Sequence, residues 1–209
     1  MQKVIFNLED TLLHFVPAKS MNAITDQFRE LACHFLYGGY LRVGNSCRVY
    51  FRSVEFYYWD EKDAENPLND EKMYHCDGKY PTPVGMEMMP YYPAMSLHAH
   101  TSGFDICFEK ECEYRAGALI RGFVVQFGNS HTNYKIVTKN GKQEYKECAD
   151  GEYDPCSTHL YTVINGLRIG KGVTIDIEWV DTEMPDPLPS PRAERRKNIP
   201  DNKPWQFIY

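Results

Sequence analysis

Three absences narrow the classes of protein to which this chain of 209 residues can belong. Its seven cysteines include no C-x-x-C pair, which argues against a structural zinc site of the usual form. Their odd number, together with the lack of a signal-peptide-like apolar run at the N-terminus, predicts reduced thiols in a cytoplasmic protein. No stretch approaches the roughly 20 apolar residues that cross a bilayer, so we expect no membrane association.

Net positive charge is absent as well. The chain has 23 Lys and Arg against 29 Asp and Glu, a formal net charge of −6. Its surface as a whole therefore lacks the basic character typical of nucleic-acid-binding domains. Aromatic residues are plentiful, with 15 Tyr and 11 Phe, and such side chains serve cores, interfaces and stacking surfaces.

The length suits a single domain spanning residues 1–209, with enough chain for a substantial core. Residues 1–18 show few helix signals and are expected to be extended. A helix is predicted to begin after Ser20, a favourable N-cap, and to stop at Gly38-Gly39. Its apolar positions recur at helical spacing, namely Ile24, Phe28, Leu31 and Phe35.

The later segments are assigned from turn signals and from alternation. Residues 158–164 fit either a short helix or a strand. The remaining expectations are an acidic loop at 59–72, a hairpin turn at Asn140-Gly141, a strand at 172–180, a Pro-rich connector at 185–191 and a docked aromatic C-terminus at 204–209.

The stretch RVYFRSVEFYY, residues 48–58, predicts a strand that carries a carboxylate near its end. Strict alternation places Glu55 on one face with Val49 and Phe51, and puts Val54 and Phe56 on the other. Burying the Glu55 anion without a partner would be costly, so a catalytic role is one explanation. The alternative is a glutamate on a solvated strand face.

A second strand is predicted at 116–125, an apolar run with Arg121 in its middle. A buried arginine needs a carboxylate or phosphate partner, and Glu55 is the natural candidate. The alternative is that Arg121 reaches solvent at a strand end.

Histidines add further candidates. His75 follows the acidic loop, and His98 and His100 share one side of an extended segment that Gly103 bends before the next strand. These two histidines, with Asp105 or Glu109, could hold a metal in a hydrolase, a hypothesis we rank below those that follow.

Five short motifs follow one another along almost the whole chain. They are Glu55-Phe56-Tyr57, His75 in a loop, the glycine-containing segment 97–108, Leu119-Ile120-Arg121-Gly122, and a C-terminal pair, Ser190-Pro191-Arg192 and Pro204-Trp205-Gln206-Phe207-Ile208-Tyr209. In this order they resemble the alkyladenine (3-methyladenine) DNA glycosylase family. That family has Glu-x-Tyr, a loop histidine, Leu-Leu-Arg-Ala, Ser-Pro-Arg and Pro-Trp-Arg-Phe-Tyr.

The resemblance implies a single compact α/β (α+β) domain with a curved, mostly antiparallel sheet and flanking helices. It implies that damaged DNA is the partner and that an alkylated purine is flipped out and released by hydrolysis. Glu55 would be the general base that activates water, and Arg121 would position it. Tyr57, His75 and either His98 or His100 would enclose the base, with cation–π attraction to a charged purine. No metal and no cofactor are implied, and we expect a monomer.

Two features depart from the family. Thr101 and Ser102 stand where the family has a tyrosine wedge before the glycine, and the chain is acidic. They favour an alternative function: a non-catalytic or repurposed binding protein of the same fold, which holds a purine-like or other small ligand and does not bind duplex DNA.

Overall fold

The computed structural model describes residues 8–70, 73, 91–100, 103–166, 175–179, 185–192 and 203–209. His75, Thr101 and Ser102, like most of the segment 71–90, lie outside the described residues. The described elements make an α+β fold with an open, antiparallel sheet of ten strands. No described helix is both long and apolar enough to span a membrane.

Helix α2, Met21–Tyr37, begins and ends where its sequence signals place it. The Ser20 hydroxyl accepts a hydrogen bond from the backbone N–H of Ala23, and the N–H of Gly38 closes the last turn on His34. The apolar stripe that includes Phe28 and Phe35 is fully buried. Our expectation of an extended N-terminus was wrong for one part, because residues Leu8–Leu13 form a short helix, α1. Its Leu8 and Leu12 pack in the core against residues that are distant in sequence. Local helix propensity does not predict this stabilising contact.

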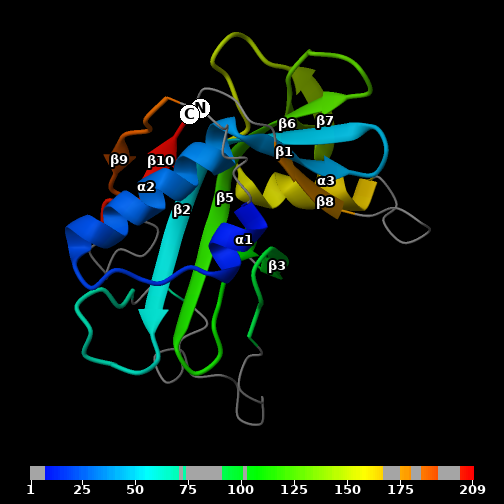
Figure 1. The fold of residues 1–209 in the computed structure, drawn as a ribbon. Helices are drawn as coiled ribbons and strands as arrows, with labels where there is room; N and C mark the ends of the chain where they lie inside the picture. Colours follow the sequence, from blue (N-terminus) through cyan, green and yellow to red (C-terminus); the bar gives the residue numbers. More distant parts are fainter. Residues whose placement is uncertain are drawn as a thin grey trace, which may run out of the picture.

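The sheet is built around two long strands, β2 (Cys47–Asp60) and β5 (Tyr114–Phe127), which pair antiparallel along their length. Beyond β5 lie β4 (Gly103–Cys107) and β3 (Ser96–His100). Beyond β2 lie β1 (Gly39–Val43) and β8 (Ile175–Trp179). Helix α2 crosses the two long strands, as Figure 1 shows.

Two smaller additions complete the sheet. Strand β10, Gln206–Ile208, pairs with β2 on the same side as β1, and β9, Pro189–Ser190, pairs with β10. The hairpin of β6 (Tyr134–Lys139) and β7 (Lys142–Glu147) turns at Asn140-Gly141. Both turn residues have positive φ, 51° and 75°, as the predicted hairpin turn requires.

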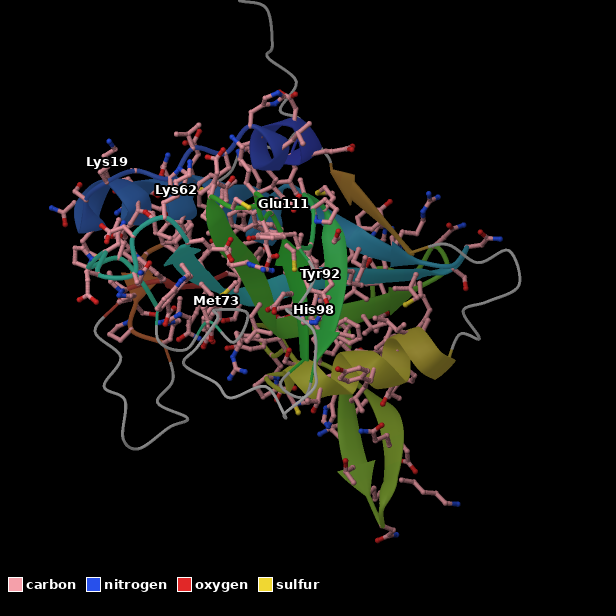
Figure 2. All side chains as sticks on the ribbon, turned by 90° about the horizontal axis from the view of Figure 1, so that it is seen from below. Lys19, Lys62, Met73, Tyr92, His98 and Glu111 are labelled. Carbon is pink, nitrogen blue, oxygen red and sulfur yellow. The ribbon has the colours of Figure 1, made fainter. Side chains whose placement is uncertain are left out.

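In the C-terminal half, the structure decides one open alternative and confirms one expectation. Residues Ser157–His159 form a 3-10 turn that leads into helix α3, Leu160–Gly166, so the segment 158–164 is helical. The aromatic C-terminus is docked, because Trp205 is completely buried and its indole N–H donates to Thr25 of α2. In Figure 2, α1 and α2 lie on one side of the sheet and α3 lies on the other.

The face assignment for β2 was wrong, and the reason is a pair of β-bulges. Phe51 lies opposite Phe123 and Val54 opposite Ile120, but Arg52 and Arg121 have no residue opposite them. Each extra residue shifts the alternation by one. Phe35 of α2 therefore contacts both Phe51 and Phe56, with ring centroids 6.3 and 6.0 Å away. Glu55 points to the other face, away from α2.

Candidate functional site

A row of opposed residues crosses five strands on the sheet face that turns away from α2. Its members, in spatial order, are His98 on β3, Asp105 on β4, Leu119 on β5, Glu55 on β2 and Gln206 on β10. Residues directly opposite each other in a sheet project from the same face. Three of the five, His98, Asp105 and Glu55, are ionisable and come from separate strands. The register of the strands thus places these side chains on one face of the sheet.

Glu55 and Arg121 form an ion pair, as the sequence predicted for two charged residues on buried strands. Arg121 Nε lies 3.2 Å from Glu55 Oε1, and only 3 % of Glu55 and 8 % of Arg121 are exposed. The contact does not have hydrogen-bond geometry. Glu55 Oε1 and Arg121 Nε and Nη1 are buried and make no hydrogen bond within the described structure. Glu55 Oε1 can therefore accept, and Arg121 Nε and Nη1 can donate, further hydrogen bonds.

The bulge in β5 contributes to this geometry. Arg121 is itself the extra residue, between Ile120, which faces the core, and Gly122, which lies opposite Ser53. Bulges re-aim side chains and are enriched next to active sites. A side chain at Gly122 would run into the Tyr153 ring, since a Cβ there would lie 2.6 Å from it. Glycine thus lets Tyr153 pack against the bulge.

Tyr57 holds the second oxygen of the carboxylate. Its hydroxyl donates a 2.7 Å hydrogen bond to Glu55 Oε2. Burial, reinforced by the Glu55 charge, raises the pKa of Tyr57 well above its ordinary value, so the phenol keeps its proton and remains a donor. Tyr57 thereby orients the carboxylate and leaves Oε1 toward Arg121.

Arg192, from the Ser-Pro-Arg motif, supports Tyr57 from behind. Its guanidinium carbon lies 4.4 Å from the centre of the Tyr57 ring, and it donates to the Phe56 carbonyl and to Asp70. Arg192 is only 3 % exposed. Its charge therefore lies in the interior and contributes little to the surface.

At the far end of the row, His98 faces Asp105, with Nδ1 of the ring 3.9 Å from a carboxylate oxygen. Both residues are buried, at 8 % and 7 % exposure. The ring of Tyr92 packs against the imidazole at a centroid distance of 4.3 Å, and Figure 2 labels the two residues close together. His100 lies two residues further along β3, and nothing is described of its side chain.

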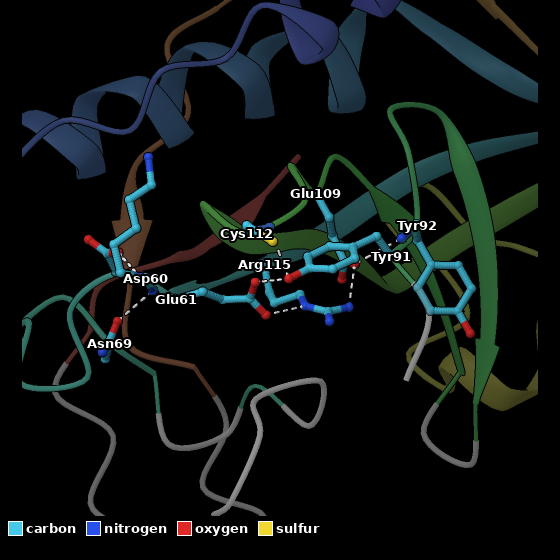
Figure 3. Close-up of polar contacts among 9 residues, drawn as sticks. Asp60, Glu61, Asn69, Tyr91, Tyr92, Glu109, Cys112 and Arg115 are labelled. Atoms are coloured by element: carbon cyan, nitrogen blue, oxygen red, sulfur yellow. Dashed lines mark hydrogen bonds and ion pairs between the residues drawn. The ribbon is translucent and has the colours of Figure 1, made fainter. Parts of the chain in front are cut away.

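A second buried charge cluster lies on the strand ends next to this row, and our sequence analysis missed it. Arg115 donates from Nε to Glu61 at 2.7 Å and from Nη1 to Glu109 at 3.0 Å, and it lies 3.6 Å from the Tyr91 ring centre. Figure 3 shows the guanidinium between the two carboxylates. The even spacing from Arg121 would have placed Arg115 on the same face, but the predicted strand began at residue 116, two residues after the start of β5 at Tyr114.

The structure therefore brings together Glu55, Arg121 and Tyr57, and sets His98 in the same row. His75 is outside the described residues. Within the described ranges, no group of three or more His, Cys, Asp or Glu side chains is arranged to hold a metal ion, so the described residues give no support to the metal hypothesis.

A scan against protein-family models, a search of curated proteins and a search of solved structures each find no match to this chain.

Proposed function

We propose that the protein is an N-glycosylase that hydrolyses the bond between an alkylated purine and its deoxyribose in damaged DNA. The observation that carries the proposal is the buried carboxylate of Glu55. One of its oxygens is held by Tyr57, and the other faces Arg121 without a hydrogen bond. The order of motifs along the chain, which resembles that of the alkyladenine glycosylase family, supports the same conclusion.

In the proposed reaction, a water molecule binds at Glu55 Oε1 and gives up its proton to that oxygen as it attacks the sugar carbon. The hydrogen bond from Tyr57 fixes the carboxylate, so that the basic oxygen points at the water. Arg121, whose Nε lies 3.2 Å from Oε1, is the partner of opposite charge for the buried carboxylate and holds it in line. The base departs with the electron pair of the broken bond.

The test is release of 3-methyladenine from methylated duplex DNA by the wild-type protein and by Glu55→Gln. We expect the variant to lose activity by at least about 100-fold, because glutamine keeps the shape but cannot accept the proton. Glu144→Gln, an exposed glutamate on β7, is the matched control and should behave as wild type. Equal release by Glu55→Gln, or none by the wild type, removes the proposal.

A second candidate is a protein of this fold that holds a purine-like or other small ligand without acting on duplex DNA. The net charge of −6 and the burial of Arg192 favour it, because both reduce the positive charge that a duplex would meet. Thermal unfolding with free 3-methyladenine distinguishes the two. Stabilisation by the base, with no release from DNA, would establish the second candidate.

A further inference from the structure

The hairpin of β6 and β7 has two unlike faces. Residues directly opposite each other in a ladder share a face, so the register of the hairpin sorts its side chains. One face is mostly uncharged and carries Tyr134, Ile136, Thr138, Gln143, Tyr145 and Glu147. The other, the lysine face, carries four lysines with one valine and one acid, namely Lys135, Val137, Lys139, Lys142, Glu144 and Lys146. In a chain of net charge −6, the lysine face is a local concentration of positive charge.

The mostly uncharged face holds the hairpin to the body. Ile136 is buried, and its backbone N–H donates to the Asp154 carboxylate at 2.8 Å. The Tyr145 ring packs edge-on against Phe127, with the ring centroids 4.9 Å apart. Since this face is turned to the body, the lysine face is turned outward, and every residue of β7 is exposed.

The hairpin projects on the side of the sheet to which Glu55 points. Figure 2 shows it, in yellow-green, extending past α3 on the face away from α2. It joins the sheet where Tyr134 lies opposite Val125 of β5, and Glu55 lies opposite Leu119 of the same strand. The six positions from Leu119 to Val125 span roughly 20 Å, the length of about six base pairs of B-DNA. A duplex that ran along β5 from Glu55 would therefore meet the hairpin about six base pairs from the flipped nucleotide.

Lys139 and Lys142 are the most available of the four lysines. They lie directly opposite each other beside the Asn140-Gly141 turn, and both are exposed. Within the described structure neither forms an ion pair, whereas Nζ of Lys135 lies 2.8 Å from a carboxylate oxygen of Glu152. Like charges directly opposite each other destabilise a ladder, so the pair at the turn is unfavourable unless an anion lies beside it.

The shape and spacing of the hairpin suit the phosphates of a duplex. A two-stranded ribbon fits the major groove of B-DNA, which is about 12 Å wide. The four positions from Lys135 to Lys139 span about 13 Å, so the two opposed lysine pairs can reach phosphates on the two sides of that groove. Contacts to phosphates fix the position of a duplex without reading its sequence.

We propose that the lysine face of the β6–β7 hairpin binds the phosphates of duplex DNA and thereby positions the duplex for the site at Glu55. This inference rests on the proposed glycosylase function, and it gives the hairpin a role in binding rather than in catalysis. Glu144, which lies opposite Val137 between the lysine pairs, contacts no phosphate in this arrangement. Loss of the lysines should therefore raise KM and leave kcat unchanged.

The experiment measures binding of an undamaged duplex of about 30 base pairs by fluorescence anisotropy at several salt concentrations. In Lys139→Gln/Lys142→Gln, we expect affinity at low salt to fall about tenfold, and the slope of log affinity against log salt to become shallower by about one for each lysine removed. Lys139→Arg/Lys142→Arg keeps both charges and should match wild type. Two controls should not weaken binding, namely Glu144→Gln and Lys19→Gln, an exposed lysine beside α2 on the other side of the sheet.

Duplex length tests where the hairpin meets the DNA. On a duplex with about four base pairs on each side of an abasic-site mimic, Lys139→Gln/Lys142→Gln should bind as wild type does, because this DNA ends before it reaches the hairpin. Thermal unfolding checks the fold. Since the substitutions remove a like-charge pair, the double variant should be at least as stable as wild type.

Each outcome decides a different point. The role of the hairpin is overturned if the wild type binds no duplex, if Lys139→Gln/Lys142→Gln binds the long duplex as wild type does, or if it loses equally on both lengths. Displacement of the duplex by polyglutamate as readily as by more duplex would also overturn it, because the partner would then be any polyanion. Release of 3-methyladenine by the wild type in these cases leaves the glycosylase function standing. Lysine-dependent duplex binding without base release would support the hairpin and remove the glycosylase function.

Discussion

Glu109 is a single buried carboxyl that makes stability depend on pH. Its side chain accepts hydrogen bonds from Arg115 and from the backbone of Tyr92. Burial nevertheless outweighs these donors and raises its pKa from 4.5 to about 7. The folded protein thus binds a proton at this residue in a range of pH where the unfolded chain has lost it.

The sign of the effect follows from that difference. The stabilisation from protonated Glu109 is complete below pH 4.5 and is lost as pH rises to about 7. We expect the free energy of unfolding of the wild type, relative to Glu109→Gln, to fall by roughly 3 kcal/mol over that range, at about 1.4 kcal/mol per pH unit. Urea denaturation at a series of pH values measures it.

Glu113 provides a contrast of opposite sign. Its hydrogen bond from Lys110 lowers its pKa, so it stabilises the fold above pH 4.5 and loses that effect as pH falls. The wild type relative to Glu113→Gln should therefore gain stability with rising pH. A parallel course for the two comparisons would contradict the assignment for Glu109.

At the scale of elements, the bulges in β2 and β5 decide which side chains meet. If Arg52 followed the regular alternation and formed no bulge, Glu55 would share the face of Phe51 and point under α2. With both bulges present, Phe51 and Phe56 stay in the core and Glu55 reaches Arg121. The two bulges thus allow the aromatic residues of β2 to pack in the core while Glu55 points to the opposite face.

A glycine pair tests how tightly the bulge is packed. At Gly122 a Cβ would lie 2.6 and 2.7 Å from two Tyr153 ring atoms, whereas at Gly117 its nearest neighbour would be 3.6 Å away. We expect Gly122→Ala to destabilise the protein by about 1–3 kcal/mol through overpacking. Gly117→Ala should be close to neutral, because an alanine loses less backbone entropy on folding. Chemical denaturation measures both, and equal effects would show that the bulge has room for a methyl group.

At the scale of the whole molecule, charge is the property that most directly concerns the proposed partner. The chain carries a net charge of −6. Arg192 is buried in an ion pair with Asp70 and a hydrogen bond to the Phe56 carbonyl of β2. Electrostatic attraction to phosphates therefore contributes little across the surface as a whole. Any recognition of damaged DNA must depend on the flipped nucleotide and on local contacts.

Salt dependence of binding tests this view. For a duplex that carries an abasic-site mimic, we expect binding at low salt and a slope of log affinity against log salt equivalent to about one to three released counterions. The undamaged duplex is the control and should bind more weakly. Fluorescence anisotropy at several salt concentrations gives the slopes. No binding at low salt would exclude DNA as the partner, and a steep slope would reveal a basic surface beyond the described residues.

Local signals determined the parts of this protein that depend on neighbours in sequence. The N-cap at Ser20, the apolar spacing through Phe35 and the turn at Asn140-Gly141 each act within a few residues, and each element was confirmed. The ion pair of Glu55 with Arg121 was also foreseen, because a charge inside an apolar strand requires a partner of opposite sign.

Tertiary structure decided which face Glu55 occupies, what holds Arg115 and Arg192, and that His98 and Asp105 share a row with Glu55. It also made a helix of Leu8–Leu13, whose apolar side chains gain their stability from distant core residues. The physical reason is register. A one-residue bulge reverses every later side chain on a strand, and the contact of Glu55 with Arg121 between two strands depends on that phase, which no short stretch of sequence specifies.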